Sequence, residues 1–289
     1  MLARAVDRPL VTLSTHLDTV PPFIPPRRHG GRLHGRGACD AKGIAAAMLC
    51  AAERLRSTGV PAALLFVVGE ETAHDGAHAA NAVRTSSRVL VNGEPTESTL
   101  ALGTKGAMRF TLRTAGRAAH SAYPQLGRSA THALVRLLAE LEALELPRDE
   151  LLGETTVNVG TLAGGVADNV LAPSAEARLM ARLVGPPEEF LARLRAWVGD
   201  RATIEVGPTM PPVRLAALPG FPTSVVAYAT DVPALTNWGT PYLFGPGSIH
   251  VAHTDGEYVE IDELRAAVEA YERIAREALE RDPEPGTRD

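Results

Sequence analysis

Apolar runs and amphipathic stretches alternate along the chain through residue 102. Short apolar runs bounded by turn residues are typical of buried strands, whereas longer Ala- and Leu-rich stretches indicate helices. The pattern predicts strands at 9–15, 62–68 and 87–92, and helices at 42–59 and 74–85. A strand–helix–strand–helix–strand order with short links predicts a parallel sheet with crossover helices.

From residue 103 the pattern changes to alternating, half-exposed strands and two amphipathic helices. The predicted order is strand 107–116, helix 128–146, strand 155–165, strand 174–185, helix 187–200 and strand 202–207. Strand, helix, strand, strand, helix, strand is the order of a ferredoxin-like domain. A Pro-rich linker at 207–222, a strand at 241–245 and a helix at 261–280 then follow. In that helix one face carries Leu264, Val268, Tyr271, Ala275 and Leu279.

These elements predict an α/β fold in two domains. We expect a main domain (1–102 and 208–289) with a mostly parallel sheet flanked by helices. An inserted ferredoxin-like α+β domain (103–207) is expected to interrupt it.

Composition excludes several classes of function. The 289 residues carry a net charge of −5 and no dense run of Lys and Arg, which argues against a nucleic-acid partner. Cys39 and Cys50 can form neither a disulfide framework nor a four-cysteine zinc site, and they fit a reducing setting. No apolar stretch reaches the ~20 residues of a membrane helix, and the N-terminus lacks the features of a secretory signal. We expect a soluble cytoplasmic protein with no membrane partner.

Acidic and histidine residues follow the predicted strands of the main domain. They are His16, Asp18, Glu70, Glu71 and Glu94 at strand ends, Asp40 before the first helix, and His253 after a Gly-rich segment. Parallel strands present their carboxyl ends at one edge of a sheet, where ligands bind. Imidazole and carboxylate together favour zinc, cobalt or manganese. The combination predicts a site for a pair of divalent metals.

Glu70 and Glu71 stand side by side directly after a buried strand. Two adjacent carboxylates resist desolvation unless a cation stands nearby or water solvates them. Consecutive residues of an extended strand point in opposite directions, so one can bind metal while the other is free to act as a base. A solvated strand end is the alternative interpretation.

Seven stretches resemble a known family. They are "STHLDTVP", "GRGACDAKGIAAAM", "VVGEET", "VNGEPT", "AAHSAYPQLGRSA", "GGVADNVLAP" and "FGPGSIHVAHTDGEYV". The family is that of the co-catalytic zinc metallopeptidases and deacylases, which includes acetylornithine deacetylase, succinyl-diaminopimelate desuccinylase and glutamate carboxypeptidase. The stretches span nearly the whole chain, and the last one is most similar to the acetylornithine deacetylase branch of amino-acid (arginine) biosynthesis.

The resemblance implies a role for each residue of the site. It assigns two divalent ions, zinc or alternatively cobalt, to five ligands: His16 and Glu94 on one, Glu71 and His253 on the other, and Asp40 bridging both. Asp18 would orient His16, and Glu70 would be the general base and acid. His250 is the rival of His253 as a ligand.

The resemblance also implies that the inserted domain is a lid and a dimerisation domain. His120 would stabilise the oxyanion, reaching the partner's site in a homodimer, and Asn169 and Arg182 would hold the substrate. The alternatives are a surface turn for His120 and a solvated strand face for Arg182. Met180 stands where the family usually has an acid.

The implied function is hydrolysis of a small N-acyl amino acid, most simply N-acetylornithine or N-acetylcitrulline, by a metal-bridging water that Glu70 activates. A dipeptidase or carboxypeptidase would use the same site and stays open. Family members usually carry a further helix and strand before the first H-x-D strand. The chain is therefore expected to be either a compact variant or a shortened homologue, whose impaired form could act in binding or oligomerisation.

Overall fold

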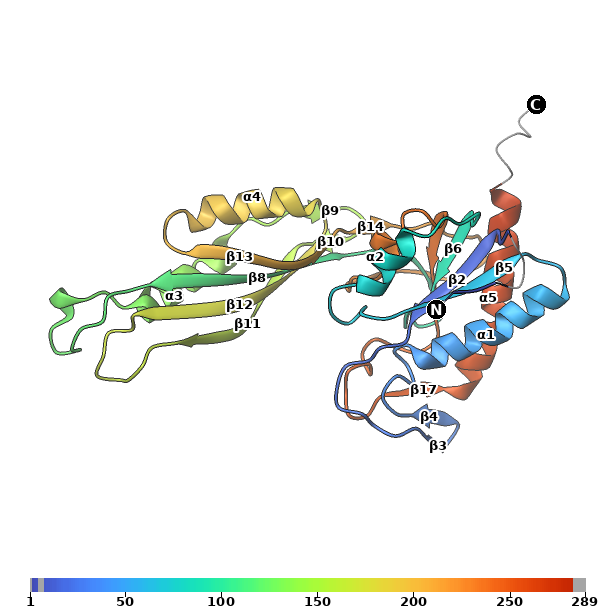
Figure 1. The fold of residues 1–289 in the computed structure, drawn as a ribbon, viewed down its shortest axis with the longest axis horizontal. Coiled ribbons are helices and arrows are strands. Elements are labelled where there is room, and N and C mark those ends of the chain that lie inside the picture. Colours follow the sequence, from blue (N-terminus) through green and yellow to red (C-terminus); the bar gives the residue numbers. More distant parts are fainter. Residues whose placement is uncertain (1, 5–7, 283–289) are drawn as a thin grey trace, which may run out of the picture. The chain divides into compact units, whose positions relative to one another are not determined.

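A computed structural model describes residues 2–4 and 8–282 (Figure 1). The chain divides into two compact units. The first holds the described residues up to Thr104, the segment Val213–Val226 and the described residues from Thr230 on. The second holds Lys105–Pro212 and Ala227–Ala229.

The sheet of the first unit is mostly parallel. Its order is β1 (Leu2–Arg4), β5 (Ala62–Val67), β2 (Val11–His16), β6 (Val89–Asn92) and β16 (Thr240–Leu243). Only β1 pairs antiparallel among these strands, and the predicted α/β fold is confirmed. Every residue of β2, β5 and β6 is buried, as in a sheet whose two faces are covered.

Helices cover this sheet. α1 (Lys42–Ser57) and α5 (Ile261–Arg281) contact each other, and they pack on β2, β5 and β6 (Figure 1). Their core residues include Met48 and Tyr271, both fully buried. On the predicted apolar face of α5, Val268, Tyr271 and Ala275 are buried, while Leu264 and Leu279 are partly buried. α2 (Asp75–Asn81) is shorter than the predicted helix 74–85, and a short turn of 3₁₀ helix at Val232–Ala234 lies beside it.

Two small sheets of the first unit have no counterpart in the predicted elements. One has the order β17 (Tyr258–Glu260), β4 (Arg32–His34) and β3 (Arg27–His29). The other has the order β14 (Val213–Arg214), β7 (Leu100–Thr104) and β15 (Thr223–Val226). Most of these strands have two to four residues, too few for a recognisable alternation.

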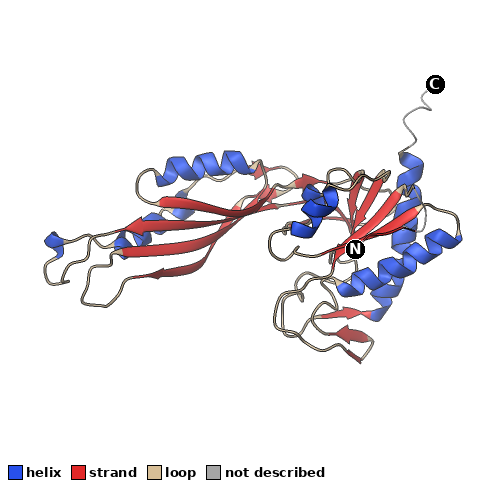
Figure 2. Ribbon diagram, in the orientation of Figure 1, coloured by secondary structure: helices blue, strands red, loops and turns tan. Residues whose placement is uncertain are grey.

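The second unit has an antiparallel sheet. The strands follow the order β11 (Thr156–Gly164), β12 (Ser174–Leu183), β8 (Gly106–Ala115) and β13 (Thr203–Met210). The helices α3 (Ala130–Ala139) and α4 (Pro187–Val198) complete the ferredoxin-like order of elements (Figure 2). Alternate residues of β8 and β12, such as Phe110 and Leu179, are buried with Leu134 and Phe190 of the helices.

α3 ends earlier than the predicted helix 128–146. A 3₁₀ turn at Leu141–Ala143 and the two-residue strands β9 (Arg148–Asp149) and β10 (Gly153–Glu154) follow it. Another 3₁₀ turn, Pro124–Leu126, precedes α3. No helix of the described residues is long and apolar enough to cross a membrane.

Candidate metal centre and active site

Three neighbouring parallel strands deliver the candidate residues to one edge of the sheet. His16 is the last residue of β2, Glu70 and Glu71 lie in the turn after β5, and Glu94 follows β6 by two residues. Asp40 lies just before α1, which begins at Lys42. Because β5, β2 and β6 are adjacent and point the same way, residues distant in sequence meet at their carboxyl ends.

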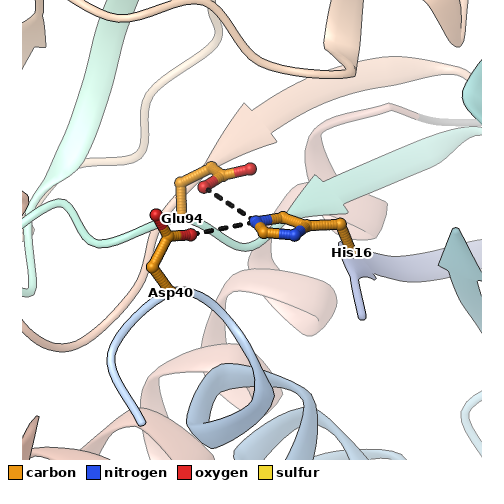
Figure 3. A group of neighbouring side chains, drawn as sticks. All are labelled: His16, Asp40 and Glu94. Atoms are coloured by element: carbon orange, nitrogen blue, oxygen red, sulfur yellow. Dashed lines mark hydrogen bonds and ion pairs between the residues drawn. The ribbon is translucent and has the colours of Figure 1, made fainter. Parts of the chain in front are cut away.

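The first potential ligand group is buried. His16 Nε2 lies 2.9 Å from Asp40 Oδ1 and 3.8 Å from Glu94 Oε2 (Figure 3). All three residues are at most 5% exposed. Glu94 Oε1 is buried with no hydrogen-bond partner among the described residues. A buried carboxylate oxygen in this state is costly unless a cation compensates it, so this oxygen fits a metal ligand.

The second potential ligand group shares Asp40 with the first. His253 Nε2 lies 3.2 Å from Asp40 Oδ2 and 3.1 Å from the carboxylate of Glu71. Asp40 thus offers one oxygen to each group, and the candidate ligand atoms of each group lie within 4.8 Å of one another. Imidazole and carboxylate in this arrangement suit divalent transition metals. His250 belongs to neither group found among the described residues.

Asp18 joins the ends of β2 and β5. Its Oδ1 lies 3.5 Å from His16 Nδ1, and its two carboxylate oxygens accept the backbone N–H groups of Glu70 (3.4 Å) and Glu71 (3.2 Å). Burial alone would raise the pKa of Asp18, but the contacts with His16 and Glu71 lower it to about 2. Asp18 is therefore ionised, and it holds both the His16 ring and the turn that carries the two glutamates.

Several side chains of the cluster have raised pKa values. Burial, and next the charge of Glu94, raises the pKa of Glu70 to about 10. Burial also raises the pKa of Glu94 to about 7. Hydrogen bonds to Asp40 and Glu71 raise the pKa of His253 to about 10. Burial by itself would lower the pKa of His16. The charge of Glu94 and the hydrogen bonds to Asp18 and Asp40 have the larger effect, so the pKa of His16 is raised. Cations bound at this place could offset the crowded carboxylates instead of these protons.

Two further contacts of this unit were not predicted. His74 Nδ1 lies 2.8 Å from Asp231 Oδ1, and Asp231 is 1% exposed. The charge of Asp231 also contributes to the raised pKa values of Glu70 and Glu94. Glu257 accepts the backbone N–H of Asp40 at 3.1 Å. Glu257 belongs to the quoted "DGEYV" motif, which could have singled it out, whereas no local pattern marks Asp231.

The residues predicted in the inserted domain separate into two places within the second unit. His120 forms a β-bridge with Val170, and Ser121 donates its N–H to Asn169 O at 2.9 Å, so His120 and Asn169 lie on facing loops. Both are exposed. Arg182 stands at the opposite end of β12, paired with Ala107 and Thr156. The structure therefore does not bring Arg182 beside the other two.

Comparison with known proteins identifies the family. The model of Peptidase family M20/M25/M40 matches residues 12–277. The chain belongs to this family. A Peptidase M20 domain-containing protein of Schizosaccharomyces pombe is 41% identical over 276 residues, which cover 91% of this chain and 68% of the relative. A probable carboxypeptidase of Aspergillus clavatus is 38% identical, with 96% of this chain and 71% of the relative covered.

Solved M20 structures share the fold. The M20 family metallo-carboxypeptidase Sso-CP2 of Sulfolobus solfataricus has a TM-score of 0.75 at 18% identity, covering 95% of this chain and 86% of that one. The YXEP protein of Bacillus subtilis, a dinuclear metal binding peptidase of the family, has a TM-score of 0.68 at 14% identity, covering 96% and 85%. The family resemblance inferred from the sequence is confirmed, whereas these comparisons do not single out the acetylornithine deacetylase branch. The chain is a hydrolase of the metallopeptidase type.

Proposed function

We propose that the chain hydrolyses the amide bond that joins a peptidyl or acyl group to a free amino acid, in the manner of a carboxypeptidase or dipeptidase. The observation that carries the proposal is the position of Asp40, whose two carboxylate oxygens face two separate potential ligand groups. The curated relatives named as probable carboxypeptidases support this substrate class.

The ligand groups fit two divalent ions. His16, Asp40 and Glu94 would hold one ion, and Asp40, Glu71 and His253 the other. Zinc is the ion we propose, with cobalt as the alternative that the same ligands accept. Bound there, the ions would supply Lewis acidity and make water more acidic.

Glu70 is the proposed general base and acid. It belongs to neither ligand group of the described residues, and the charges of Glu94, His16 and Asp40 all influence its pKa, which supports a role beside the metal ligands. The charge of the bound ions would lower the pKa of Glu70 from about 10, and the ionised carboxylate would then take a proton from the attacking water and hand it to the leaving amine nitrogen. Asp18 keeps the Glu70 turn in place through the backbone.

The second unit contributes an oxyanion donor in this proposal. Nδ1 of His120 accepts the backbone N–H of Ala122 at 3.1 Å. An imidazole that accepts at Nδ1 carries its proton at Nε2, so the exposed Nε2 is a hydrogen-bond donor. Donation to a developing oxyanion is a contribution typically worth ~3 kcal/mol. Asn169 and Arg182 stay our proposed contacts to the substrate.

We also propose a homodimer through the second unit. β11 is an edge strand, and every residue of it except Val157 is exposed. An exposed edge strand offers unpaired backbone groups to a second chain.

Deacylation of an N-acetyl amino acid is the second candidate function. It is favoured by the stretch "FGPGSIHVAHTDGEYV", which resembles the acetylornithine deacetylase branch and carries His253. The two candidates share a leaving amino acid with a free carboxylate and differ in the group that is removed from it.

Release of primary amine from a panel of substrates tests both candidates. The chain, loaded with zinc or cobalt, is assayed with dipeptides, longer N-blocked peptides, N-acetylornithine and N-acetylcitrulline, with an EDTA-treated control. Metal-dependent release from peptides supports the carboxypeptidase or dipeptidase. Release from the acetylated amino acids alone supports the deacylase. No release from any of them, with two metals bound, would contradict both.

A further inference from the structure

A buried ion pair lies beside the candidate metal centre without belonging to it. Arg36 Nη1 is 2.6 Å from Glu257 Oε2. The two residues are 7% and 2% exposed, respectively. Burying two such charges is unfavourable unless the pair is close and further hydrogen bonds compensate for the lost water. The further hydrogen bonds show what this pair holds.

Glu257 binds the loop that ends in Asp40. Its Oε1 accepts three backbone N–H groups, from Gly37 at 2.9 Å, Cys39 at 3.1 Å and Asp40 at 3.1 Å. Backbone N–H groups that converge in this way form a concave anion site, which the carboxylate occupies. The loop needs Gly37 for this, because its φ of +85° lies in the left-handed region. The backbone position of Asp40 therefore depends on Glu257.

Arg36 binds the loop that follows His253. Its Nη1 donates to Thr254 O at 3.1 Å, and the N–H of Gly35 donates to Glu257 O at 3.0 Å. Directly after these contacts along the chain, β17 pairs with β4, and Tyr258 lies opposite His34 in this pairing (Figure 1). The ion pair thus joins the two loops that supply Asp40 and His253, although 213 residues separate these two ligands in the chain.

We propose that Arg36 and Glu257 are positioning residues that hold Asp40 and His253 at the spacing that a shared metal ion requires. The inference rests on the metal centre of the proposed function. Neither residue belongs to a potential ligand group of the described residues, and both bind the backbone of the loops that carry the ligands. Partners of this kind, beyond the ligands themselves, typically change metal affinity by 10–100-fold when they are mutated.

Glu257→Gln tests the proposal, because glutamine keeps the size and removes the charge. The metal-free 289-residue chain is titrated with zinc against a chromophoric chelator at 25 °C, and the visible spectrum of bound Co²⁺ is recorded. We expect zinc to bind roughly 10–100-fold more weakly, with an altered Co²⁺ spectrum. Thermal unfolding of each variant verifies that it is folded at 25 °C.

The chain offers a matched control three residues away. Arg32 and Glu260 also form an Arg–Glu pair at 2.6 Å, but on the surface and without a hydrogen bond to a ligand loop among the described residues. Glu260→Gln is expected to leave zinc affinity within twofold of the wild type. A folded Glu257→Gln variant with equally unchanged affinity and spectrum would overturn the proposal and leave the pair a purely structural role.

Glu257→Gln leaves Arg36 buried without its counter-charge, which can prevent folding. A second variant tests the proposal in that case. The double variant Arg36→Met/Glu257→Gln removes both charges. Weakened zinc binding in the folded double variant supports positioning, and wild-type affinity overturns it. These titrations need no substrate. A wild-type chain that binds fewer than two ions would instead contradict the proposed function itself.

Discussion

The first unit buries a group of charged side chains where its parallel strands end, whereas the ion pairs described in the second unit each have at least one exposed partner. His16, Asp40 and Glu94 are at most 5% exposed. In the second unit Arg113 pairs across strands with Glu176 and Glu205, and the side chain of Arg113 is 45% exposed. Acidic and basic residues are thus buried close together at the site of the first unit, but are at least partly exposed to solvent in the ion pairs of the second.

The cause of the difference is the kind of sheet. A parallel sheet is covered on both faces, so charged side chains on its strands are accommodated only at the strand ends, where they converge. An antiparallel sheet can face water on one side, and alternate residues then point to solvent. Charged groups that converge away from solvent have shifted pKa values, as Glu70 does. Charged groups that are dispersed in solvent favour solubility and form only weak ion pairs.

The largest difference in effect on kcat between a substitution in the first unit and one in the second is expected for Glu70. Glu70→Gln removes the proposed base and should lower kcat by roughly 10²–10⁴-fold, while zinc still binds, since Glu70 is in neither ligand group of the described residues. Glu205→Gln, in an exposed pair of the second unit, should leave kcat unchanged. Steady-state kinetics and metal analysis of both variants provide the check. A kcat within tenfold of the wild type would remove Glu70 from the mechanism.

Zinc binding should release protons from the ligand groups of the first unit. At pH 7 the metal-free His253 is protonated, because its pKa is raised to about 10, and a ligating imidazole must be neutral. Zinc affinity should therefore increase with pH between 6 and 8, about tenfold per pH unit for each proton released. Calorimetry in buffers of different ionisation enthalpy counts the protons. His253→Asn should release fewer, and His250→Asn the same number as the wild type; the reverse would make His250 the ligand.

A cavity in the apolar core of either unit should destabilise the protein by a similar amount, although the charged residues of the two units differ. Leu13 of β2 and Leu179 of β12 are 0% and 4% exposed. Replacing either leucine with alanine leaves a cavity and should destabilise the protein by ~2–5 kcal/mol. Urea unfolding followed by circular dichroism measures both changes. A cost under ~1 kcal/mol at one site would mean that its surroundings collapse into the cavity.

The smallest effect is expected for a surface ion pair of the second unit. Arg201 Nη1 lies 2.6 Å from Glu140 Oε2, with side chains 41% and 51% exposed. Exposed pairs typically contribute ~0.2–1 kcal/mol, so Glu140→Gln should shift the urea midpoint only slightly. The shift should shrink further at high salt, because salt screens exposed charges. A larger, salt-independent loss would show that this pair is not a simple surface pair.

Most helices and strands of the two main sheets were predicted from local sequence patterns, and the wrong predictions have local causes. The strand end carrying His16 and the helix after Asp40 were predicted from periodicity and turn residues, whereas Glu70 and Glu71 lie in a turn after β5 and not in the extended strand that was assumed for them. The helix predicted at 128–146 ends at Ala139 in the structure, because apolar residues continue through its 3₁₀ turn and mimic a longer helix. The strands β4 and β17 were missed because three residues carry too little alternation.

The amino-acid sequence by itself determined the order of elements, the two-domain pattern and the residue types of the site, because these depend on periodicity and on neighbours along the chain. Only the tertiary structure decided that Asp40 faces both ligand groups, that His253 rather than His250 joins one of them, and that Glu94 Oε1 is buried without a partner among the described residues. Those properties depend on strand β2 lying between β5 and β6 and on the pairing of β17 with β4. Packing between distant segments sets such distances, and no local pattern encodes them.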